Sequence, residues 1–307
     1  MSLSEIHTQK STNGRTHPIQ LVNRGLSILA PGLAAVVAEQ LFITVFRHRP
    51  PQREAEWAKS ATELSIPSPY GDLAAWVWGD GPKTVLLVHG WAGRGLQMGA
   101  FVQPLVEAGY RVVAYDAPSH GASPGRQANL FKLTEGLTAV AGAVGPLEGV
   151  IAHSLGTTAV LLAASRGELD PGRFVAISPM ANTRTMSRHY AEMTGFRPEV
   201  VDAMRSRFEH RYDFRWDEIE PARLAENFAP EALVIHDRDD RELPAEEGEA
   251  LARVMPAGRS MTTRGLGHRR ILRNPGVVRS ATDFIRSSLK RNTHSVVSPR
   301  EKAVSAA

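Results

Sequence analysis

The chain has 307 residues, of which 42% are hydrophobic and 22% charged, which is the composition of an ordinary globular protein. Its net charge of +4 comes from 36 basic and 32 acidic residues, and no run of five Lys or Arg occurs, which argues against nucleic-acid binding. The absence of cysteine excludes disulfides, thiolate zinc sites and a cysteine nucleophile.

The segment in front of the main domain, residues 1–59, begins with 18 polar residues and no secretory signal, which predicts a cytoplasmic location. Its first apolar stretch, Gly25 to Ala38, is too short to cross a bilayer, and its aliphatic residues have helical spacing. We therefore expect an amphipathic helix there, followed by a linker at 47–58.

This helix has two possible surroundings. It can pack against the main domain, or it can make a weak membrane-surface contact through residues 19–49, which the basic residues Arg47, His48 and Arg49 would support.

From residue 60 to residue 289, strands and helices alternate. Continuous Val, Leu and Ile strands between helices are typical of a parallel sheet buried on both faces. We predict an α/β fold with a mostly parallel central sheet flanked by helices, and an antiparallel hairpin at its start. Strands are expected at Thr62–Ile66, Leu73–Trp78, Thr84–Val88, Tyr110–Tyr115, Gly149–Ala152, Arg173–Ile177, Ala232–His236 and Arg259–Thr263, and helices at Ala100–Ala108, Leu130–Val144, Leu155–Ser165, Ala245–Val254 and Val277–Leu289.

Residues 182–228 interrupt this alternation with helix-like pieces that are rich in Arg and aromatic residues and contain no strand pattern. An insertion of this length after a strand is commonly a lid over a site, although it can also cover a sheet edge. The polar tail at 290–307 is expected to be disordered.

The most informative stretch is Val150-Ile151-Ala152-His153-Ser154-Leu155-Gly156. A buried strand runs directly into a serine and then into a helix of small, apolar residues. The chain must turn sharply there, so the serine oxygen is held out at the end of the sheet, as a nucleophile requires.

Other loops with polar residues follow the carboxyl ends of the strands, where ligands bind in parallel sheets. The motifs are His89-Gly90-Trp91, the loop from Asp116 through His120-Gly121 to Ser123, an acidic turn from Asp237 to Pro244, and Gly267-His268. Together with the serine turn, and in this order, they resemble the α/β-hydrolase superfamily over about residues 60–289.

The resemblance implies a Ser-Asp-His triad in the order that this fold uses. Ser154 would be the nucleophile, His268 the general base, and Asp240 the carboxylate that orients the imidazole. The backbone N–H groups of Trp91 and Leu155 would form the oxyanion hole.

The acid has two competitors in the same turn, Asp237 and Asp239. The resemblance favours Asp240, because the family's turn usually reads His-Gly-x-x-Asp with Pro four residues later, a pattern that His236, Asp240 and Pro244 match. Of the other histidines, His89 and His120 are expected to organise loops, and His153 to point away from the nucleophile. Ala152 stands where the family usually has the first glycine of the turn.

These residues predict a serine hydrolase that cleaves an ester or related acyl bond of a small-molecule substrate through an acyl-serine, without metal or organic cofactor. Acyl transfer or perhydrolysis would use the same triad, and a hydrolase-like binding protein with little turnover would keep the same fold. The sequence does not separate these alternatives and does not indicate the oligomeric state.

Overall fold

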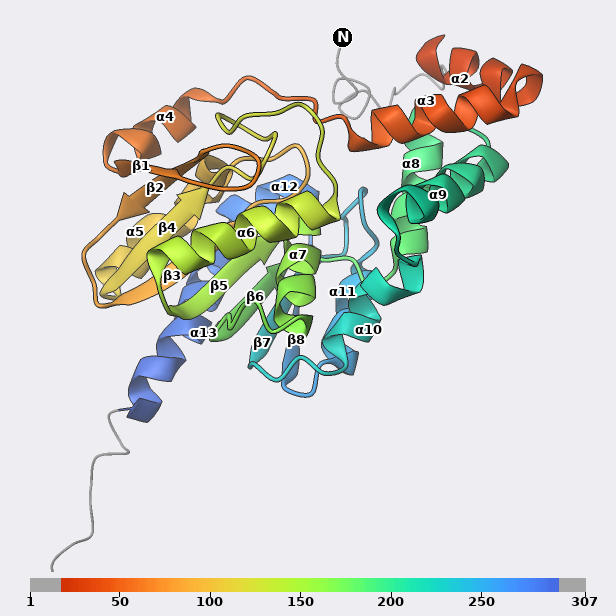
Figure 1. Ribbon diagram of the computed structural model, residues 1–307. Coiled ribbons are helices and arrows are strands. Elements are labelled where there is room, and N and C mark those ends of the chain that lie inside the picture. The colour runs from red at the N-terminus through yellow and green to blue at the C-terminus, as the bar shows by residue number, and fades with distance from the viewer. Residues whose placement is uncertain (1–17, 293–307) are drawn as a thin grey trace, which may run out of the picture.

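The structure is a computed structural model that describes residues 18–292. Its centre is one eight-stranded sheet with the order β1-β2-β4-β3-β5-β6-β7-β8 (Figure 1). In this order the strands from β4 to β8 run parallel to one another, whereas β1 pairs antiparallel with β2, and β2 antiparallel with β4, at one edge. Their bounds are β1 Thr62–Ile66, β2 Leu73–Trp78, β3 Lys83–Val88, β4 Tyr110–Tyr115, β5 Leu147–His153, β6 Arg173–Ile177, β7 Ala232–Asp237 and β8 Gly258–Thr263.

Helices bury both faces of this sheet. Alternate residues of β3 enter two separate cores, Leu86 and Val88 on one face and Val85 and Leu87 on the other. The first face is covered by α6 (Leu130–Val144), α7 (Leu155–Ser165) and α11 (Ala245–Val254), and the second by η1 (Gly95–Phe101), α5 (Val102–Glu107), η3 (Ile271–Arg273) and α13 (Pro275–Asn292). The predicted fold class is therefore confirmed, and two-sided burial explains the continuous apolar strands.

The predicted N-terminal helix is in fact two helices, α2 (Pro18–Leu29) and α3 (Pro31–Ile43). Pro31 has no N–H to continue a helix but fits the first turn of a new one, so the apolar pattern is divided at this residue. The single helix over Gly25–Ala38 was wrong in its bounds for this reason.

The predicted linker also contains a helix, α4 (Gln52–Lys59). Its Trp57 fits against Gly99, where a Cβ would lie 2.2 Å from the indole, and the Trp57 carbonyl accepts a hydrogen bond from Trp78. The half-buried Trp57 and the buried Glu54, which pairs with Arg94, therefore anchor a helix whose residues show no apolar periodicity.

The insertion at 182–228 is helical throughout, with α8 (Thr183–Thr194), α9 (Pro198–Tyr212), η2 (Trp216–Ile219) and α10 (Pro221–Ala225). Figure 1 shows α2, α3, α8 and α9 grouped beside the sheet, and we call these four helices the cap. The cap is built from two chain segments that lie far apart in the sequence.

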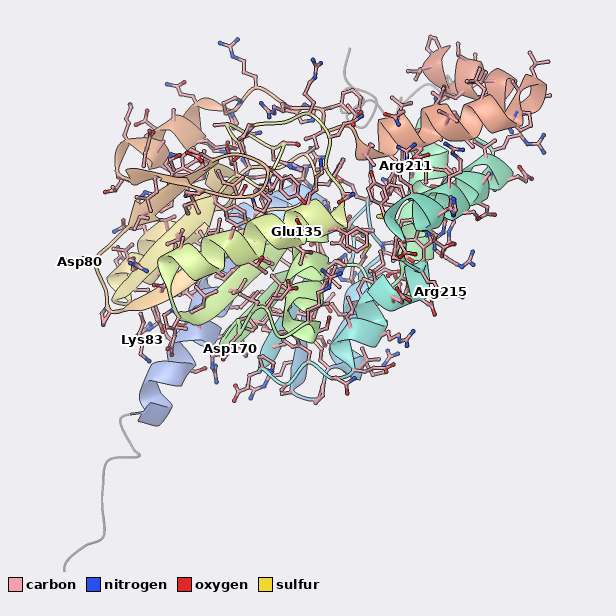
Figure 2. All side chains as sticks on the ribbon, viewed as in Figure 1. Asp80, Lys83, Glu135, Asp170, Arg211 and Arg215 are labelled. Atoms are coloured by element: carbon pink, nitrogen blue, oxygen red, sulfur yellow. The ribbon has the colours of Figure 1, made fainter. Side chains whose placement is uncertain are left out.

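Small residues hold the cap together. Ala34, Ala35 and Ala38 of α3 are buried against α9, so that the two helix backbones approach closely. The fully buried carboxylate of Glu39 accepts contacts at 3.0 Å from Arg207 and from Arg211, which is labelled in Figure 2. The α3–α9 contact thus combines apolar packing with an ion-pair network.

The structure bears on the expected disordered tail at 290–307 and on the possibility of a membrane-spanning helix. Helix α13 continues to Asn292, so the first three residues of the expected disordered tail are helical, and residues 293–307 lie outside the described residues. Over residues 18–292, no helix has both the length and the apolar character that a membrane span requires.

We predict that Ala38→Leu disrupts the cap and leaves the sheet intact, because overpacking a tight helix contact costs about 1–3 kcal/mol. Limited proteolysis should then cut within residues 18–43 faster than in the native protein. Leu33→Ala is the matched control, because Leu33 is exposed on the same helix. Unchanged proteolysis of the Ala38→Leu protein would contradict the close α3–α9 packing.

Candidate active site

Ser154 lies in a turn with no intervening loop between β5 and α7. Its backbone has φ 50° and ψ −125°, a conformation that is costly for a residue with a side chain. The turn is held from outside, because the Ser154 N–H donates to the Ile177 carbonyl at 2.9 Å. The predicted strand–serine–helix turn is thus present in its strained form.

Two glycines let the neighbouring loop press against this turn. A Cβ at Gly90 would lie 2.8 Å from the Ser154 Cβ, and one at Gly156 would lie 2.5 Å from the His89 carbonyl oxygen. Both positions therefore require glycine for close approach, and the loop after β3 lies directly against the serine turn.

His268 and Asp240 are in direct contact. His268 Nδ1 donates to Asp240 Oδ2 at 2.7 Å, and the Asp240 side chain is completely buried. The other carboxylate oxygen accepts the N–H groups of Glu242 and Leu243 at 2.8 and 3.0 Å. Every donor around Asp240 thus favours its charged form.

The pKa of Asp240 reflects this balance. Burial by itself would raise the pKa, but hydrogen bonds from His236 and His268 and from the Leu243 N–H outweigh it, so the pKa lies well below its ordinary value. A carboxylate that stays charged beside Nδ1 fixes the imidazole tautomer with Nε2 free to accept a proton.

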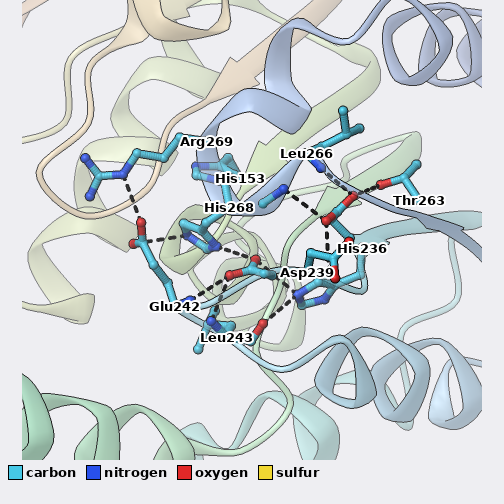
Figure 3. A network of polar contacts seen from close by, with 12 residues as sticks. His153, His236, Asp239, Glu242, Leu243, Thr263, Leu266, His268 and Arg269 are labelled. Atoms are coloured by element: carbon cyan, nitrogen blue, oxygen red, sulfur yellow. Dashed lines mark hydrogen bonds and ion pairs between the residues drawn. The ribbon is translucent and has the colours of Figure 1, made fainter. Parts of the chain in front are cut away.

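The two alternative acids, Asp237 and Asp239, bind backbone N–H groups and not the imidazole of His268. Asp237 accepts the N–H groups of Leu266 and Gly267 at 3.1 and 3.0 Å, and Asp239 accepts that of Gly265 at 2.7 Å. Both carboxylates therefore hold the loop that carries His268, and neither bonds to its ring. Figure 3 shows this network around His268.

His153 has a role that the sequence reasoning missed. Its Nε2–H donates to the His268 carbonyl at 2.9 Å, and the two rings lie 4.7 Å apart (Figure 3). Because His153 is the residue before Ser154, this bond ties the serine turn to the loop of His268. A histidine directly before the serine was the only signal in the sequence.

Ser154 and His268 line the same cavity of about 250 Å³. No hydrogen bond joins the Ser154 hydroxyl to His268 among the described residues. Such bonds are often long in the absence of substrate and tighten when it binds. The three predicted side chains therefore meet at one edge of the sheet, with one pair in contact and the serine beside them.

The cap supplies most of the far wall of this cavity. Both cap segments contribute, since α3 provides Leu41 and Phe42 while the insertion provides mostly apolar and aromatic side chains. These are Met186, Tyr190, Met193, Phe208, Trp216 and Ile219. The wall therefore suits an apolar group more than a charged one.

The mouth of the cavity carries one charged pair. Glu242 contacts Arg269 at 3.1 Å and lies 3.9 Å from His268 Nε2, as Figure 3 shows. These are the charged side chains of the described residues that line the cavity next to the imidazole.

The two predicted oxyanion donors lie at the same edge. Leu155 is the first residue of α7, and Trp91 follows the Gly90 that packs on Ser154. Both residues line the cavity, and within residues 18–292 neither backbone N–H has a hydrogen-bond acceptor in the protein. Two N–H groups are thus available beside the serine.

Buried histidines and one aspartate connect the surrounding loops, as expected for His89 and His120. His89 donates through Nδ1 to Gly90 and accepts the Ala117 N–H through Nε2, and Asp116 accepts the Gly95 N–H at 2.7 Å. Burial lowers the pKa of His89 to about 3 and that of His120 to about 4, so both rings are neutral.

No group of three or more His, Asp or Glu side chains within residues 18–292 is arranged to hold a metal ion. Among the residues that the structure describes, the charged side chains at the cavity are those of the Glu242–Arg269 pair, beside uncharged polar residues such as Gln97 and Asn129.

Comparison with known proteins identifies a family and a fold. The model of the Alpha/beta hydrolase family matches residues 85–285, which is more than half of the chain. A serine hydrolase-like protein of Danio rerio is 38% identical over 74 residues, a stretch that spans only 22% of that relative and 24% of this chain.

Two solved structures illustrate the fold. An esterase from Pyrococcus furiosus is 19% identical with a TM-score of 0.61, covering 81% of this chain and 97% of its own. Est1E from Butyrivibrio proteoclasticus, solved with ferulic acid, is 17% identical with a TM-score of 0.57 and covers 75% and 99%. At these identities the similarity shows the fold alone.

The buried histidines predict acid sensitivity. Burial lowers the pKa of His153, like that of His89, to about 3. Below the unfolded pKa of about 6.5 the unfolded chain therefore binds protons that the folded protein does not. The free energy of unfolding is highest above this pH and decreases as the pH falls toward 4. Each histidine contributes up to about 1.4 kcal/mol per pH unit in this range. Burial raises the pKa of Asp116 to about 6, so this one carboxyl stabilises the folded protein as the pH falls and offsets part of the destabilisation by the three histidines.

The measurement is urea unfolding at about pH 7 and about pH 5, where the free energy of unfolding should be lower at the acidic value. His120→Asn, whose amide can donate to the same Pro118 carbonyl, should reduce this difference by roughly two fifths, because one histidine contribution is removed while the opposing Asp116 remains. His210→Asn is the control, because His210 is exposed on α9. Equal stability of the native protein at both pH values would disprove the account.

Proposed function

Because this chain belongs to the alpha/beta hydrolase family, we propose that it is a serine hydrolase that cleaves esters or related acyl bonds through an acyl-serine intermediate. The observation that carries the proposal is the arrangement at one cavity of a strained Ser154 and of His268 held by a buried Asp240. This pairing of nucleophile, base and orienting acid is the recurring arrangement of acyl transfer to serine.

In the proposed first step, the Ser154 oxygen bonds to the substrate carbonyl carbon while its proton passes to His268 Nε2. The carbonyl oxygen becomes an oxyanion that the N–H groups of Trp91 and Leu155 stabilise, and one such donor is worth about 2.7–4 kcal/mol. Collapse breaks the bond to the leaving group, which takes the proton from Nε2.

In the second step, water attacks the acyl carbon and gives a proton to Nε2. The acid leaves when the Ser154 oxygen regains that proton from the imidazole. Asp240 remains a carboxylate throughout and stabilises the imidazolium in each half-reaction.

The cavity wall favours an apolar acyl group. The cap residues named above offer no fixed charge, while Trp91 narrows the space beside the oxyanion donors. We therefore expect a carboxylester or thioester with an aliphatic or aromatic acyl part. A cytoplasmic location, expected from the sequence, remains a prediction.

We predict that a fluorophosphonate probe labels the native protein and does not label Ser154→Ala, because only an activated serine attacks phosphorus at neutral pH. Circular dichroism shows whether both proteins are folded. Ser178→Ala is a matched control, since Ser178 also has positive φ near the sheet edge but is fully buried. A folded native protein that takes up no probe would leave a binding protein as the better description.

We also predict the effect of removing the base and the acid on nitrophenyl ester hydrolysis. His268→Ala and Asp240→Asn should each lower kcat by about three to four orders of magnitude. His120→Ala and Asp239→Asn should lower kcat far less, because neither side chain contacts the His268 ring. Comparable losses in both pairs would mean that the base and acid are wrongly assigned.

A further inference from the structure

Helix α2 is turned with its polar side inward. Its buried residues are Asn23 and Ser27, whereas an amphipathic helix on a protein core normally buries its apolar residues. Asn23 Nδ2 donates to the Thr194 carbonyl at 2.8 Å, and Ser27 Oγ accepts the Arg197 N–H at 3.3 Å. Gln20 donates to the Met193 carbonyl at 3.1 Å. The helix thus binds the end of α8 through hydrogen bonds.

The opposite side of α2 is apolar and faces outward. Leu29 is 86% exposed and Val22 is 67% exposed, values that are unusual for large aliphatic side chains in a folded domain. Almost all of the exposed large hydrophobic residues of the described chain lie on α2 and the first turn of α3, namely Ile19, Leu21, Val22, Ile28, Leu29 and Leu33, with Leu64 on β1 as the exception. We call these six residues the α2 surface.

Arginines lie beside the α2 surface. A surface depression next to it is lined by Arg24 of α2 and by Arg184 and Arg188 of α8, all three exposed. The depression also contains Glu192, and its full lining has five arginines and three acidic residues, so its net charge is positive. Exposed aliphatic residues next to arginines are typical of a helix that lies in the headgroup region of a bilayer.

From this arrangement we propose that the α2 surface binds a lipid bilayer, with α2 lying in the plane of the membrane surface. A second copy of the chain is a poorer occupant, since six side chains on one helix and one turn are far fewer than the 20–30 residues per partner of a stable interface. Figure 1 shows α2 at an outer corner of the molecule, at the far side of the cap from the sheet, where a planar membrane can reach it.

The proposed surface connects to the cavity through one helix. Helix α3 begins beside the α2 surface with the exposed Leu33 and ends with Leu41 and Phe42 in the cavity wall. A membrane on α2 would therefore lie against the outer side of the apolar cap.

The test is cosedimentation of the full-length protein with vesicles of phosphatidylcholine containing a minority of phosphatidylglycerol. The native protein should sediment with the vesicles. A variant with Leu21→Asn, Ile28→Asn and Leu29→Asn should bind at least about tenfold more weakly, because three inserted side chains are lost. The three side chains face solvent, so the variant should fold, which a circular dichroism spectrum equal to that of the native protein would verify.

Leu64→Asn is the matched control, since Leu64 is also an exposed leucine, at 40%, but lies on β1. Its vesicle binding should equal that of the native protein. Absence of vesicle binding by the native protein, or equal binding by the triple variant, would overturn the proposal. The proposal would also be overturned if light scattering showed that the native protein is a dimer and that the triple variant is a monomer. Ser154 is not part of the α2 surface, so the protein can bind vesicles even if it lacks the proposed hydrolase activity.

Discussion

The strained turn at Ser154 is the constraint on which the rest of the site depends. A serine held at φ 50° directly between strand and helix needs neighbours that prevent it from relaxing. The loop after β3 does so from one side, through Gly90 and the His89 carbonyl, and the end of β6 does so from the other through Ile177. The buried strands and loops around Ser154 therefore keep this one residue in its strained conformation.

The imidazole is fixed by a second set of contacts that depends on burial. Asp240 stays charged because its oxygens receive several donors, while Asp237 and Asp239 hold the backbone of the loop that carries His268. The three neighbouring aspartates thus divide two tasks in one turn, and their hydrogen-bond partners distinguish Asp240 from the other two. His153 then joins this loop to the serine turn through a single hydrogen bond.

The sequence predicted the sheet well because strands buried on both faces must be continuously apolar, as in β3 and β5. It predicted the order of the site residues because each follows its own strand. It missed α4, which is anchored by Trp57 and by the Glu54–Arg94 ion pair, and it did not show that His153 would contact the loop of His268. Periodicity showed that the N-terminal segment has two sides, but only the partners of Asn23 and Ser27 show which side faces the protein.

The construction of the cap from two distant segments has a consequence for synthesis. Helix α3 leaves the ribosome early, but α9, which covers Ala34, Ala35 and Ala38, follows more than 150 residues later. At about 5–20 residues per second, the alanine face waits on the order of 10–30 s for its partner. During this interval α2 and α3 form an apolar nascent segment without its native cover, so chaperone engagement would be concentrated at residues 18–43.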